Sequence, residues 1–101
     1  MPLQTFCELN EYLTKSNNER LKIQGMLNLL LVNSNTKLIA KLLRLLSKSQ
    51  DHIVFYRFVD YKNITKIFEK DTIKLIVNII KSNSGLSKNQ KIELSERLSI
   101  L

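Results

Sequence analysis

The segment Thr36–Lys48, TKLIAKLLRLLSK, constrains the fold most, because its residues separate into two faces at helical spacing. At about 100° per residue, one side carries cations within roughly 60° of arc: Lys37, Lys41, Arg44 and Lys48. The other side is aliphatic: Leu38, Ile39, Leu42, Leu43, Leu45 and Leu46. A partial copy of this arrangement runs from Lys74 to Lys81. Because such helices bury their apolar side, the segment predicts a helical core with a basic outer rim.

The composition favours an all-α fold. The chain has 101 residues but only two Gly and one Pro, and a protein of many strands needs more turn-forming residues. We therefore predict one helical domain over residues 1–101. It should contain five or six short helices, arranged as an irregular bundle or as a small stack of αα-hairpins.

Polar capping signals divide the chain into its expected helices. These are Phe6–Lys15, Asn18–Val32, Thr36–Lys48, a helix from Asp71 or Thr72 to Lys81, and a last one ending near Ser99. Residues 63–69 should form a short helix or continue the one before. Capping boxes are predicted at Thr5–Glu8, Ser16–Glu19 and Ser87–Gln90, and single caps at Ser34 or Asn35 and at Asp51.

Residues 52–60, HIVFYRFVD, fit two kinds of secondary structure. Their β-branched and aromatic side chains would suit a strand. Helices are expected on both sides, however, and no other segment offers a strand to pair with. We therefore expect a helix here.

Two local patterns bear on packing. A shift of 37 residues aligns apolar positions of 27–43 with those of 64–80, as two copies of an αα-hairpin would, although any two amphipathic helix pairs could align equally well. Gly25 lies inside an apolar helix, where it costs about 1 kcal/mol relative to Ala. It either allows another helix to approach closely or is simply tolerated.

In the first helix, Phe6, Leu9 and Leu13 should form the apolar face.

Positive charge is concentrated in the middle of the chain. The formal net charge is +7, and residues 20–50 contain six bases and no acid. Residues 1–19 instead carry three acids and one base. Such asymmetry can attract nucleic acid, an acidic protein or anionic lipid, or it can serve only as a solvated surface.

The sequence offers no set of residues for catalysis or metal binding. His52 is the only histidine and Cys7 the only cysteine, so no intramolecular disulfide or cysteine-based metal cluster can form. Gly25 and Gly85 stand alone, which excludes a glycine-rich phosphate loop. We expect no enzyme activity, no cofactor and no metal. The single thiol fits a reducing, intracellular compartment, either cytoplasmic or nuclear.

The basic helix face allows several interpretations besides a solvated surface. Its cations could contact phosphates without reading base edges, and Tyr56, Arg57, Tyr61 and Lys62 could stack on single-stranded bases. Its leucines could lie on a membrane surface, but a protein core is the easier partner for them. Leu29, Val32 and Leu45 exceed what the inner faces need, which is typical of a patch that meets a partner helix or a second copy.

We predict a non-catalytic adaptor, regulatory or assembly module that binds a protein with an acidic surface or forms a homo-oligomer. The predicted partner-binding residues are Lys37, Lys41, Arg44, Lys48, Lys74 and Lys81. A sequence-nonspecific nucleic-acid-binding protein is the first alternative. A membrane-surface effector or protective protein is the second.

Overall fold

Seven helices make up the described part of the chain, which covers residues 2–62 and 64–99 of the computed structural model. They are α1 (Leu3–Thr14), α2 (Glu19–Val32), α3 (Thr36–Lys48), α4 (His52–Val59), α5 (Ile64–Ile67), α6 (Lys70–Ser82) and α7 (Lys88–Ser99). The all-α prediction is confirmed, and residues 52–59 are helical as expected. The predicted number of five or six helices was too low.

Of the two alternatives for residues 63–69, the structure has the separate short helix, α5. The Tyr61 amide donates to Phe58 O at 3.3 Å, and the Tyr61 hydroxyl donates to Asn28 Oδ1 on α2. Both bonds lie between the end of α4 and the start of α5. Since α5 has four residues where α2 has 14, the two hairpins expected from the internal repeat are unequal, and the repeat interpretation finds no support.

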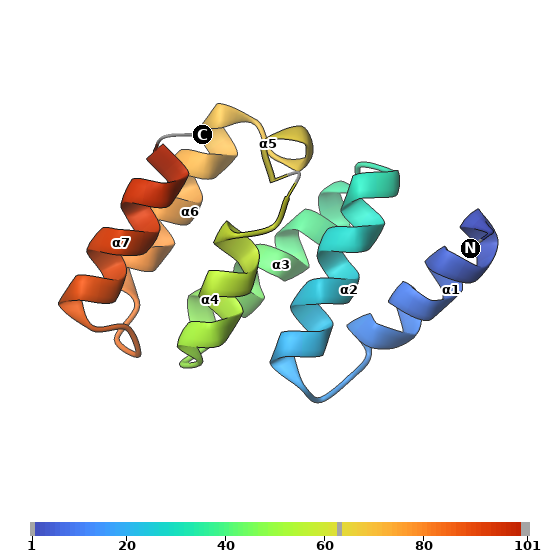
Figure 1. Ribbon diagram of the computed structural model, residues 1–101, viewed down its shortest axis with the longest axis horizontal. Helices are drawn as coiled ribbons and strands as arrows, with labels where there is room; N and C mark the ends of the chain where they lie inside the picture. The colour runs from blue at the N-terminus through green and yellow to red at the C-terminus, as the bar shows by residue number, and fades with distance from the viewer. Residues whose placement is uncertain (1, 63, 100–101) are drawn as a thin grey trace.

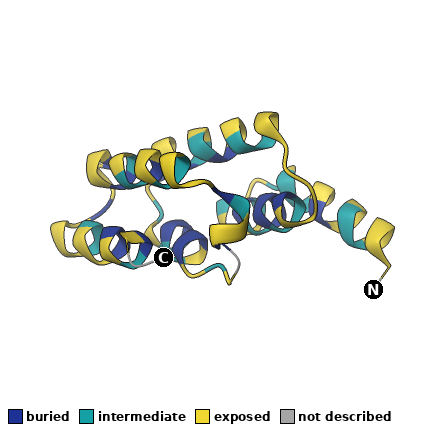
Figure 2. Cartoon of the chain, turned by 90° about the horizontal axis from the view of Figure 1, so that it is seen from above, coloured by how far each residue is buried: buried dark blue, intermediate teal, exposed yellow. Residues whose placement is uncertain are grey.

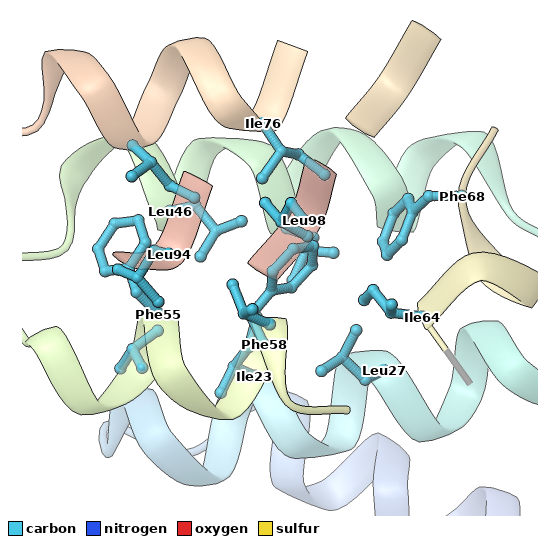
Figure 3. Close-up of a cluster of buried hydrophobic side chains, with 14 of the residues drawn as sticks. Ile23, Leu27, Leu46, Phe55, Phe58, Ile64, Phe68, Ile76, Leu94 and Leu98 are labelled. Carbon is cyan, nitrogen blue, oxygen red and sulfur yellow. The ribbon is translucent and has the colours of Figure 1, made fainter. Parts of the chain in front are cut away.

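The helices form a bundle of two layers (Figures 1 and 2). One layer runs α7, α4, α2, α1, and the other holds α6 and α3 behind it. Buried residues face the space between the layers, while exposed residues lie on the outer surfaces (Figure 2). Side chains from both layers meet there, including Leu46, Phe55, Phe58, Ile76 and Leu94, each fully buried (Figure 3).

Local capping explains most helix starts. Asn18, Asn35 and Asp51 accept backbone N–H bonds at the starts of α2, α3 and α4. The predicted Ser16–Glu19 box was wrong, because Asn18 is the N-cap and Ser16 Oγ accepts from the Asn18 amide just before the helix. The Ser87–Gln90 box is confirmed, because each side chain accepts from the other residue's amide, at 2.9 and 3.2 Å.

The Thr5–Glu8 capping box was wrong, because α1 begins at Leu3. The Phe6 amide donates to Pro2 O at 3.0 Å, so Pro2 is the N-cap and Thr5 lies within the first turn of α1, not at the capping position. Glu8 instead accepts a bond from Gln4 Nε2.

Helix α1 joins the bundle in an unusual way. Within its described residues only Asn10 is buried, whereas Leu9 is 48% exposed, which corrects the predicted Phe6, Leu9 and Leu13 face. Asn10 Nδ2 donates to Phe6 O at 2.8 Å, and Asn10 Oδ1 accepts from Asn28 Nδ2 at 2.9 Å. A polar contact therefore holds the centre of the α1–α2 interface.

Gly25 allows this close approach. A Cβ built on Gly25 would lie 2.7 Å from the backbone oxygen of Asn10 and 2.7 Å from Leu13 Cβ. Both atoms belong to the rigid part of α1, so neither can move without shifting the helix. The close-approach interpretation of Gly25 is confirmed.

We expect Gly25→Ala to destabilise the protein although Ala favours helices. Overpacking costs about 1–3 kcal/mol and helix propensity returns about 1 kcal/mol, so the net loss should be up to about 2 kcal/mol. Urea unfolding followed by circular dichroism measures it. Asn89→Ala, at an exposed position in the first turn of α7, is a control in which Ala replaces a poorer helix former without a packing conflict. Stabilisation by Gly25→Ala would show that the site has room for a methyl group.

Candidate basic groove

A shallow groove with several cations lies between α2 and α3, at the end of α1. Its volume is about 340 Å³, and its lining residues are Thr14, Glu19, Lys22, Met26, Lys41, Arg44, Leu45 and Lys48. We call this surface the basic groove. Helices α2 and α3 form its two sides because they pack against each other directly.

The apolar face of α3 sets the direction of its cations. Leu42 and Leu46 are completely buried, so the residues on the opposite side of the helix must face solvent. Lys41, Arg44 and Lys48 are accordingly exposed and spaced three or four residues apart on one side.

Helix α2 adds a fourth cation and much of the floor. Lys22 is half-buried one turn before Met26, which is 5% exposed, and both line the groove. Leu45 of α3 is half-buried there. The groove therefore combines an apolar floor with four cations.

The charge of the basic groove is mostly uncompensated. Four cations face one carboxylate, that of Glu19, which leaves a formal charge of +4 − 1 = +3. Glu19 Oε1 accepts a hydrogen bond from Ser49 Oγ at 3.0 Å. Within residues 2–62 and 64–99, the ion pairs involve Arg20 and Arg97 and none of the groove cations. The site is thus suited to an anionic ligand or partner.

The structure separates the six predicted partner-binding residues. All six are exposed, but only Lys41, Arg44 and Lys48 line the basic groove. Lys74 lines a different pocket, next to α5 and α7. Lys37 and Lys81 line neither of these two surfaces.

Sequence reasoning missed Lys22, Met26 and Thr14 as groove residues. The i, i+4 spacing of Lys22 and Met26 places them on one face of α2, which is a signal that the sequence carries. Thr14 could not be found in this way, because it reaches the groove only through the packing of α1 on α2.

The tyrosines considered for base stacking have other roles. Tyr56 is half-buried, donates from its hydroxyl to Glu93 Oε2 at 2.7 Å and lies under the Arg97 guanidinium, 5.3 Å from the ring centroid. Tyr61 is half-buried and bonded to Asn28. Both rings are half-buried at the edge of the core and both hydroxyls are bonded within the fold.

His52 and Cys7, the single histidine and the single cysteine, lie on different helices. His52 is exposed at the start of α4, edge-on to Tyr56, and Cys7 is half-buried on α1. Across residues 2–62 and 64–99, no group of three or more His, Cys, Asp or Glu side chains could hold a metal ion.

Of the three apolar residues predicted to remain at the surface, only one is exposed. Val32 is 41% exposed, whereas Leu29 and Leu45 are half-buried. Among the described helices, none is both long enough and apolar enough to cross a membrane.

An ion pair fixes the start of α2 beside the α3–α4 junction. Arg20 Nε donates to Asp51 Oδ2 at 2.7 Å, and Asp51 Oδ1 also accepts from the Ile53 amide. The hydrogen bond from Arg20 holds the pKa of the Asp51 carboxyl below its ordinary value, and Asp51 raises the pKa of Arg20.

Comparison with known protein families, curated proteins and solved structures finds no match for this chain.

We expect Asp51→Asn to reduce the acid sensitivity of the fold while keeping the α4 cap, since Asn is also a good cap. The folded-state pKa of Asp51 is lowered, so its stabilising effect is present above the unfolded value near 3.8 and is lost as the pH falls. Urea unfolding from about pH 5 to about pH 2 should show the stability of wild type and Asp51→Asn converging.

Arg20→Gln removes the other partner of this pair and should produce a similar convergence. If Asp51→Asn and Arg20→Gln both run parallel to wild type over the whole range, the ion pair does not contribute to stability.

Proposed function

We propose that this protein is a non-catalytic adaptor, regulatory or assembly module whose basic groove docks an acidic, amphipathic segment of a partner protein. The observation that supports this best is the combination of Lys22, Lys41, Arg44 and Lys48 with the apolar floor of Met26 and Leu45. An amphipathic helix offers apolar side chains at every third or fourth position, with acids beside them. Such a segment would fill the floor and neutralise the rim.

A nucleic acid is a poorer match to this groove. Phosphate contacts need cations but gain nothing from an apolar floor. The hydroxyls of Tyr56 and Tyr61, the two tyrosines considered for base stacking, are also engaged within the fold.

One observation nevertheless favours nucleic acid as a second candidate function. The exposed row on α3 continues beyond the groove to Lys37, with a rise of about 6 Å between successive cations. A phosphate backbone following the row would use Lys37, whereas a segment seated in the groove would not.

The membrane-surface alternative has little physical support. To reach lipid, the leucine face of α3 would have to leave the core, where Leu42 and Leu46 are fully buried. Exposing each such side chain costs about 1.5–3 kcal/mol.

Two matched double variants separate the candidates. Lys41→Glu/Arg44→Glu reverses two groove cations, and Lys37→Glu/Lys81→Glu makes the same charge change outside the groove; each lowers the net charge from +7 to +3. The probe is a labelled model peptide that forms a Leu- and Glu-rich amphipathic helix, measured by fluorescence anisotropy. We expect the groove variant to lose at least about tenfold in affinity, because buried charge-assisted contacts become repulsive. The matched variant should retain binding within about threefold.

Nuclease-treated lysate extends the test to natural partners. A protein captured by wild type and by Lys37→Glu/Lys81→Glu, but not by the groove variant, supports docking in the groove. Equal losses for both double variants, together with a steep decrease of affinity for a labelled oligonucleotide with salt, would favour nucleic acid instead. Circular dichroism confirms that all variants fold.

A further inference from the structure

A second concave site lies at the end of the bundle where α6 begins and α7 ends, next to α5 (Figure 1). It is a separate pocket of about 670 Å³ and does not share a lining residue with the basic groove. Its described lining residues are Thr65, Phe68, Lys70, Ile73, Lys74, Val77, Asn78, Leu98 and Ser99. Residues 100–101, which follow Ser99, lie outside the described part of the chain. The volume falls within the range of about 300–1,000 Å³ that is typical of small-molecule sites.

The walls of this pocket are apolar. Phe68 and Leu98 belong to the buried core, and Ile73 and Val77 are half-buried against it. Figure 3 shows Phe68 and Leu98 among the core side chains, on different segments of the chain. An alkyl chain could replace water along these walls, since burial of apolar surface is the main favourable term for such a ligand.

The charged lining residues among those described are both cations. Lys70 and Lys74 are exposed and lie one turn apart at the start of α6, on the same side as Ile73 and Val77. No side chain caps the start of α6, so its first backbone N–H groups add positive potential there. The exposed Asp71 and Glu69 are close in sequence but do not line the pocket. The charged end of a ligand should therefore be an anion.

We propose that this pocket binds a single-chain amphiphile with an anionic head, specifically a free alkyl carboxylate of the fatty-acid type. The alkyl chain packs along Phe68, Ile73, Val77 and Leu98. The carboxylate pairs with Lys70 and Lys74. Thr65 and Asn78 supply further polar groups at the wall. This inference is independent of the basic groove and its partner.

The experiment titrates the full chain with sodium dodecanoate below its micelle concentration, by calorimetry and by backbone NMR shifts. We expect saturable binding, with shifts centred on Phe68, Ile73, Val77 and Leu98. Removing each CH₂ from the chain should weaken binding about fourfold, because each buried CH₂ adds apolar stabilisation. Dodecyltrimethylammonium, which has the same tail and the opposite charge, should bind at least about tenfold more weakly.

Variants assign the site. Lys70→Glu/Lys74→Glu should weaken dodecanoate binding at least about tenfold, while Lys37→Glu/Lys81→Glu, with the same change of charge, should leave it within about threefold. Val77→Trp should fill the cavity and block binding; if that variant does not fold, the chain-length series still tests the apolar walls. Absence of saturable binding, equal binding of both surfactants, or shifts centred on the basic groove would overturn the proposal.

Discussion

The burial of the apolar side of α3 determines where the cations of this helix lie on the protein surface. Leu42 and Leu46 are fully buried between the two helix layers, and this contact fixes the rotation of the helix about its axis. Lys41 and Arg44 must then face outward, where α2 adds Lys22 beside them. The same apolar pattern that specifies the bundle thus also assembles the cationic surface, without any residue dedicated to orienting it.

Three acids are paired with arginines away from the basic groove, while Glu19 lines the groove and offsets one of its four cations. Asp51 is engaged with Arg20, and Asp60 and Glu93 with Arg97. Each of these pairs is partly exposed and contributes little stability by itself. Their larger effect is on the distribution of charge, because they leave the central lysines available and confine neutral, paired surface to other parts of the bundle.

Local signals were reliable where a structure depends on neighbours in sequence. The side chains of Asn35, Asp51 and Ser87 each accept a hydrogen bond from a backbone amide two or three residues later, so short sequence spacing predicts these caps. The Thr5 box failed because the same spacing also occurs inside a helix. The local pattern left open whether residues 63–69 form a separate helix, and the Tyr61–Asn28 bond at this break joins residues far apart in the sequence. Likewise, the division of the basic residues between a groove and a separate pocket depends on which helices pack together, and helical periodicity alone does not specify that.

The attachment of α1 has a consequence for how the molecule opens. Among its described residues, α1 places no apolar side chain fully inside the core and is held by the Gly25 contact and the Asn10–Asn28 bond. Phe6 and Leu13 are only half-buried, so release of α1 should expose less buried hydrocarbon than release of a central helix, and we expect partial unfolding to begin there. Thr14, the last residue of α1, borders the basic groove. Local opening of α1 would therefore widen that groove and expose the side of α2 that carries Gly25 and Asn28.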